Sequence, residues 1–108
     1  GRAAAERLLA RTDPDAVVCA NDLIAVGALH ALLVSGRRVP EDVALVGMDD
    51  TELAQMSFPQ ISSVSLGSAE RGQLAARLLL DRIADGTLKP RREHVAPSLA
   101  VRSSSTVQ

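Results

Sequence analysis

The sequence of 108 residues has almost no aromatic side chains: it contains one Phe and neither Tyr nor Trp. Sites for small organic molecules usually combine an apolar or aromatic face with a few convergent polar groups. This chain can offer only Phe58 for stacking. We therefore expect the stacking face of any such site to come from outside these residues.

Other absences exclude whole classes of protein. The single cysteine, Cys19, excludes an internal disulfide framework and is typical of a reducing compartment, so we expect a cytoplasmic protein. The chain contains no run of about eighteen apolar residues that could cross a membrane, and no signal segment opens it. Twelve Lys and Arg residues nearly balance thirteen Asp and Glu residues. The resulting net charge of −1 does not favour binding to nucleic acid or anionic lipid.

The motifs of common enzymes are also missing. We find no glycine-rich phosphate loop and no patterned set of metal ligands. No motif ties His30 or His94 to Cys19, so a structural thiol is favoured over a nucleophile. The sequence therefore predicts no cofactor, no metal and no enzymatic activity.

Two short apolar runs predict neighbouring parallel strands. Residues 15–20 (DAVVCA) and 43–48 (VALVGM) have the length and composition of strands buried on both faces. Between them, residues 22–35 carry apolar side chains at helical spacing, which suits the crossover helix that joins parallel strands. The fold class is therefore α/β with a parallel sheet.

Polar residues follow both runs: Asn21 and Asp22 after the first, Asp49 and Asp50 after the second. Parallel neighbours bring these pairs to one carboxyl edge, where open α/β sheets bind ligands. Such carboxylates and amides can bind a polyol, although two of them are too few for a hard cation. From spacing alone, helix capping is favoured over ligand contact, by Asn21 or Asp22, or by Asp49 in a capping box with Glu52.

The remaining segments complete a small domain. Residues 1–11 read as a helix, and residues 61–66 after Pro59 as a strand. Ser68 can cap a helix that runs to about Ala84. A final strand near residues 95–101 is placed at a sheet edge by Pro97. The apolar positions expected to face inward from the long helix are Leu74, Ala75, Leu78, Leu79 and Ile83.

Several motifs occur in a fixed order over nearly the whole chain. They are Asn21-Asp22, residues 39–43 (VPEDV), residues 46–50 (VGMDD), Pro59 before a Ser-rich strand, Gly72, and the ending 99–106 with Arg102 and Ser104. In this order and spacing they resemble the ligand-binding core of LacI/GalR-type bacterial transcription regulators. Each motif alone is common, but the ordered set is specific.

The resemblance implies an incomplete parallel-sheet sandwich of the periplasmic-binding-protein-like type I class. Members of that family carry a helix-turn-helix headpiece and two α/β lobes with a ligand cleft between them. Residues 1–108 correspond to the C-terminal portion, mostly the C-terminal lobe, and residues 60–86 to the segment that crosses to the other lobe. The headpiece and most of the first lobe lie outside this chain.

The resemblance also assigns residues. It implies that Asn21 and Asp49 contact a small-molecule effector, and we assign capping or backbone bracing to Asp22 and Asp50. A possible dimer interface would include the residues Val26, Met56 and Phe58.

The implied function is sensing of an effector, a sugar or a related metabolite, within a homodimeric DNA-binding regulator. Operator DNA would be bound only through the absent headpiece, and no contact with a membrane is expected. The alternative is a sugar-binding receptor of a transport system on the same fold. The 39–42 turn and the ending 99–106 favour the regulator.

Overall fold

The fold is a four-stranded sheet with its strands in chain order, seen in a computed structural model that describes residues 1–106. The strands β1, β2 and β3 are parallel, and β4 is antiparallel to β3. The predicted parallel sheet and the predicted edge position of the last strand are therefore confirmed. The strands are β1 (Ala16–Val18), β2 (Ala44–Met48), β3 (Ser62–Ser65) and β4 (Ser98–Ala100).

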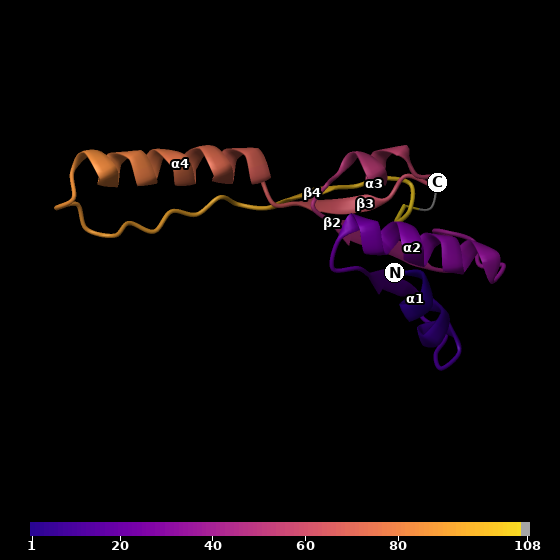
Figure 1. The fold of residues 1–108 in the computed structure, drawn as a ribbon. Coiled ribbons are helices and arrows are strands. Elements are labelled where there is room, and N and C mark those ends of the chain that lie inside the picture. Colours follow the sequence, from indigo (N-terminus) through magenta and orange to yellow (C-terminus); the bar gives the residue numbers. More distant parts are fainter. Residues whose placement is uncertain (107–108) are drawn as a thin grey trace.

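Each connection between strands contains a helix, and the last one adds a long non-helical segment that returns to β4 (Figure 1). The predicted crossover helix from β1 to β2 is present, and Gly36 follows its C-cap with a φ of 81°, the left-handed conformation that favours glycine after a helix. None of the helices that the structure describes is long and apolar enough to cross a bilayer. The helices are α1 (Arg2–Leu9), α2 (Asp22–Val34), α3 (Glu52–Met56) and α4 (Ser68–Ala84).

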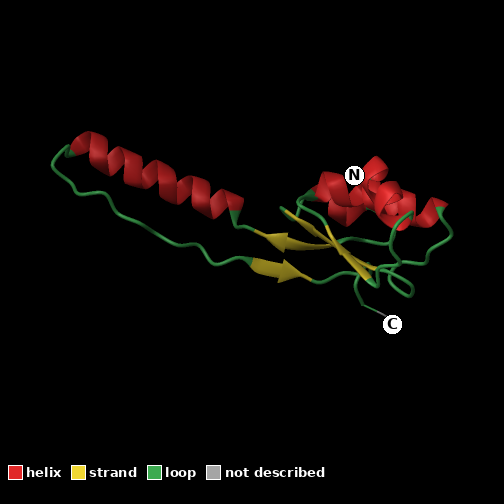
Figure 2. Ribbon diagram, turned by 90° about the horizontal axis from the view of Figure 1, so that it is seen from below, coloured by secondary structure: helices red, strands yellow, loops and turns green. Residues whose placement is uncertain are grey.

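The core lies between one face of the sheet and the helices of the N-terminal half, which gather on one side of the strands in Figure 2. On α2 the residues Ala25, Leu29 and Leu32 are buried, against Leu45 of β2 and Ile61 ahead of β3. Burial of a leucine side chain contributes about 1.5 to 3 kcal/mol to folding. This packing fixes the start of α2 relative to the end of β2, where the polar residues lie.

The opposite face of the sheet is only partly covered. Val18 of β1 is 75% exposed, although Leu45 in the neighbouring strand is fully buried. The prediction that both apolar runs are buried on both faces is therefore wrong for β1. Val18 is exposed because β1 is an edge strand of the sheet. Its side chains alternate between the helix-covered face and the open face.

Helix α4 stands apart from the sheet, with the returning segment 85–97 beside it (Figure 1). It contains no buried residue, so the predicted inward face is wrong: Leu79 is 61% exposed and Ile83 is 71% exposed. Residues of the returning segment, among them Leu88 and Val95, lie beside α4. Ser68 is not the cap either, because the N-cap position is Gly67, with a φ of 63°.

Candidate ligand-binding edge

Asn21 links the end of β1 to the start of α2. Its backbone is extended, and its side-chain Oδ1 accepts a hydrogen bond from the Ile24 N–H at 2.8 Å. Asn21 is therefore the N-cap of α2. The cap uses only the amide oxygen, and the hydrogen bonds of the described residues leave the amide nitrogen free for a further partner.

Asp22 is a brace between two turns rather than a cap. Its side chain is buried, with 1% exposure. The Oδ2 atom accepts from the Thr51 N–H at 2.7 Å and from the Thr51 hydroxyl at 2.9 Å. The Oδ1 atom accepts from the Ser63 hydroxyl at 2.6 Å. These bonds hold the turn after β1 directly against the turn after β2.

The turn after β2 has an unusual backbone. Asp49 and Asp50 have φ values of 98° and 54°, a left-handed pair that is costly for residues other than glycine. The Asp49 N–H donates to the Val64 carbonyl at 2.9 Å, and the Asp50 N–H donates to the Ser63 hydroxyl at 3.0 Å. Both neighbouring elements therefore hold the turn in place.

The side chain of Asp49 is exposed on this turn, and no hydrogen bond within residues 1–106 engages its carboxylate. The predicted capping box with Glu52 is wrong, because the N-cap of α3 is Thr51. Asp49 lies two residues ahead of that N-cap, in a left-handed backbone conformation. Asp49 therefore offers two free acceptor oxygens on a fixed support.

Asp50 braces the turn through its side chain. Its Oδ1 lies 2.5 Å from the Nη2 of Arg102, and the two side chains are 24% and 16% exposed. Sequence reasoning gave no partner for Asp50 and missed Thr51 and Ser63 altogether. The serines in the predicted strand at 61–66 were an available signal, because buried hydroxyl groups need hydrogen-bond partners.

Shifted pKa values bear on two side chains next to the strands, Cys19 and Asp42. Burial raises the pKa of the Cys19 thiol, which keeps it protonated and fits a structural role. Hydrogen bonds from Arg38 lower the pKa of Asp42 to about 2, but that pair lies in the turn before β2. Within residues 1–106, no three His, Cys, Asp or Glu side chains are grouped to hold a metal ion.

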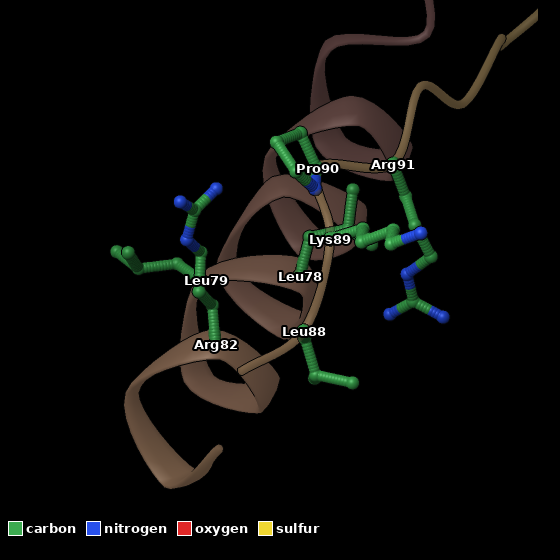
Figure 3. A pocket seen from close by; sticks show the side chains of 7 residues that line it. All are labelled: Leu78, Leu79, Arg82, Leu88, Lys89, Pro90 and Arg91. Atoms are coloured by element: carbon green, nitrogen blue, oxygen red, sulfur yellow. The ribbon is translucent and has the colours of Figure 1, made fainter. Parts of the chain in front are cut away.

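A shallow pocket of about 220 Å³ lies between α4 and the returning segment (Figure 3). It is lined by apolar Leu78 and Leu88, and the head groups of Arg82 and Arg91 point to opposite sides. Arg91 is already paired with Asp81 at 2.8 Å. This pocket is remote from the polar edge and lacks convergent polar groups.

A larger hollow of about 760 Å³ lies beside α3. Met56 and Phe58, two of the predicted interface residues, line it and are 81% and 92% exposed. Val26 does not line this hollow; it is partly buried and packs against the core. Of the three predicted interface residues, the structure thus brings Met56 and Phe58 together and leaves Val26 apart from them. The other lining residues include Pro40, Pro59 and Thr106.

Comparison with known proteins decides the family. The model of the periplasmic binding protein-like domain matches residues 1–105, which includes both turns of the polar edge. The chain belongs to this family. The predicted resemblance to LacI/GalR-type regulators is confirmed as well, because matching relatives are named as transcriptional regulators or operon repressors.

The alignments with these relatives show what share of each relative's length the chain covers. The chain is 47% identical over 105 residues to the HTH-type transcriptional regulator CelR of Thermobifida fusca, covering 96% of the chain and 31% of CelR. The chain thus spans about a third of the length of the curated relatives it matches.

Solved structures agree with the fold. A CelR–cellobiose complex matches with a TM-score of 0.91 and 46% identity, over 95% of this chain and 32% of that one. The lac repressor dimer bound to operator and the anti-inducer ONPF matches with a TM-score of 0.89 and 28% identity, over 98% and 37%. These relatives are regulators rather than enzymes or transport receptors.

Proposed function

We propose that this chain is the effector-sensing part of a cytoplasmic, DNA-binding transcription regulator and has no enzymatic activity. The observation that carries the proposal is Asp49: an exposed carboxylate without a partner in the described residues, held on a costly left-handed turn at the ligand edge of the sheet. Backbone strain of this kind persists where a site needs a side chain in one direction.

The chemistry of the edge favours a hydroxyl-rich effector. The Asp49 carboxylate can accept from two adjacent hydroxyl groups, and the free amide nitrogen of Asn21 can donate to a third. CelR, the relative cited above, was solved with cellobiose. A sugar is therefore the effector class that best fits these two residues.

We propose a domain layout that the partial coverage of the relatives supports. We assign residues 1–108 to the C-terminal portion of a two-lobed effector-binding domain, with residues 60–86 as the segment that crosses to the other lobe. Half of the cleft, including its stacking face, would come from the first lobe. Effector binding between the lobes would shift their arrangement and so the affinity of a separate headpiece for operator DNA.

The test is the substitution Asp49→Asn in the intact regulator. Asparagine keeps the size of the side chain and tolerates left-handed backbone, but it removes the charge. We expect cellobiose affinity, measured by isothermal titration calorimetry, to fall by about a hundredfold because charge-assisted hydrogen bonds are lost.

The matched control is Asp15→Asn, since Asp15 is another exposed aspartate next to a strand of the same sheet. It should leave affinity unchanged, and both variants should keep the wild-type melting temperature. Wild-type affinity in the Asp49→Asn protein would exclude Asp49 as a ligand contact.

We also propose that the regulator is a homodimer and that the surface around Met56 and Phe58 contributes to its interface. Exposed large apolar side chains around a hollow are typical of association surfaces. The lac repressor, a structural relative, was solved as a dimer. Val26 of α2, the third predicted interface residue, packs against the core and is not included in this surface.

The substitution Phe58→Glu tests this interface. Phe58 is 92% exposed, so the change should leave the fold intact while placing a charge in the interface. We expect the dimer dissociation constant, measured by analytical ultracentrifugation, to rise by about a hundredfold or more. The control Leu8→Glu, on α1, should leave it unchanged. An unchanged dimer in Phe58→Glu would place the interface elsewhere.

A further inference from the structure

Arg102 connects the Asp49-Asp50 turn to the segment that returns from α4. Its Nη2 donates to Asp50 Oδ1, and its Nη1 donates to the Ile61 carbonyl at 2.9 Å. Its backbone N–H donates to the Ser62 hydroxyl at 2.7 Å. One residue therefore contacts both the turn that carries Asp49 and the strand that leads out to α4.

The environment of this ion pair differs from that of the other arginine–aspartate pairs. Arg102 and Asp50 are 16% and 24% exposed, whereas Arg38, which also binds an aspartate, is 70% exposed. Solvent and salt screen an exposed pair strongly and a part-buried pair much less. The Arg102–Asp50 contact is therefore a strong constraint on the turn.

The turn needs such a constraint. Two consecutive non-glycine residues in left-handed conformations persist only where the surroundings hold them there. Ser63 and Val64 hold the backbone N–H groups, and Arg102 is the partner of the Asp50 side chain. Without Arg102 the Asp50 carboxylate is free to rotate, and the backbone that aims Asp49 is less defined.

The same side chain also ties the turn to the β3–β4 ribbon, which consists of Ser62–Ser65 and Ser98–Ala100. Arg102 lies two residues after β4 and reaches the residue ahead of β3. The two strands of the ribbon are the covalent connections between the sheet and α4. A shift of the ribbon is thus transmitted to the turn through a directed ion pair rather than through loose packing.

We propose that Arg102 is a positioning residue for the ligand site: it holds Asp50, fixes the direction of the Asp49 carboxylate, and links that direction to the β3–β4 ribbon. The effect on affinity rests on the proposed function, because it requires Asp49 to contact the effector. The effect on the turn does not. By linkage, an effector that binds Asp49 also favours one placement of the ribbon.

The first measurement needs no ligand. In the intact regulator, Arg102→Lys keeps the charge but loses the planar fork that reaches Asp50 and Ile61 together. We expect amide hydrogen exchange at Asp50 and Thr51 to accelerate about tenfold, with the amides in the middle of α2 unchanged. The control Arg38→Lys alters the exposed Arg38–Asp42 pair. It should leave amide exchange at Asp50 and Thr51 unchanged.

The second measurement separates positioning from general stability. Cellobiose affinity should fall about tenfold in Arg102→Lys, yet the same change should cause no further loss in the Asp49→Asn protein. A merely structural role would weaken binding equally in both backgrounds.

Three results would overturn the proposal: unchanged exchange at Asp50 and Thr51, equal acceleration throughout α2, or a full additional loss of affinity in the Asp49→Asn background. If the wild-type protein does not bind cellobiose, the choice of effector fails, and the exchange rates at Asp50 and Thr51 decide the role of Arg102 by themselves.

Discussion

Replacing Asp22 with alanine is expected to lower the free energy of unfolding by about 3 to 5 kcal/mol. The buried carboxylate accepts three hydrogen bonds, from the Thr51 N–H, the Thr51 hydroxyl and the Ser63 hydroxyl. Alanine leaves these donors without an acceptor in a site that is 1% exposed. The loss is a large fraction of the roughly 5 to 15 kcal/mol that stabilises a typical domain.

Urea unfolding followed by far-ultraviolet circular dichroism measures this loss, since the chain has no Trp to report by fluorescence. The exposed Asp15 provides the control: Asp15→Ala should change stability by less than about 0.5 kcal/mol. A loss below about 1 kcal/mol in Asp22→Ala would mean that water replaces the carboxylate and that Asp22 is not the brace between the turns.

Replacing Gly47 with alanine is expected to cost about 2 to 3 kcal/mol. A Cβ atom at this position would lie 2.3 Å from Asp22 Oδ1 and 3.3 Å from the Cβ of Ala25. The oxygen cannot move aside cheaply, because its carboxylate is held by Thr51 and Ser63 at the same time. The clash therefore disrupts either the start of α2 or the hydrogen bonds of Asp22.

A double-mutant cycle identifies the cause of this cost. In the Asp22→Ala background the clashing oxygen is gone, so Gly47→Ala should cost at least about 1 kcal/mol less than it does in the wild type. The same substitution at Gly72, in the exposed middle of α4 with no atom near its added Cβ, should stabilise the chain by about 0.5 to 1 kcal/mol. Equal Gly47→Ala losses in both backgrounds would place the clash elsewhere.

The sequence predicted the placement of the polar edge because that placement follows from topology alone. Once two apolar runs are parallel neighbours, the residues after them must share an edge, and Asn21 and Asp49 do so. The sequence does not decide which polar residue caps α2, since Asn21 and Asp22 are both good caps. The choice depends on Asp22 being drawn into the interior by Thr51 and Ser63.

Those partners could not be predicted locally. Asp22 and Ser63 are 41 residues apart, and their contact depends on the register that sets Gly47 beside Ser63 in the sheet. The sequence alone indicates no role for Gly47, which lies in the motif at residues 46–50. The structure supplies a reason for glycine: its missing side chain leaves room for the Asp22 carboxylate.

The exposed faces of β1 and α4 were mispredicted for a related reason. Apolar periodicity shows which side of an element prefers burial, but it does not show whether the covering layer belongs to the same chain. Val18 and Ile83 are apolar and largely exposed here. Their exposure agrees with a chain that spans about a third of its relatives.

The register of β3 and β4 has a consequence for how this architecture can vary. Val64 lies opposite Leu99 and Ser65 opposite Ser98, so the strands form an antiparallel hairpin whose tip has been replaced by residues 66–97. In topological terms, α4 and its return are an insertion whose two ends lie side by side. Such an insertion can be lengthened, shortened or exchanged without shifting the register of the sheet, which makes it a natural point for building chimeric sensors.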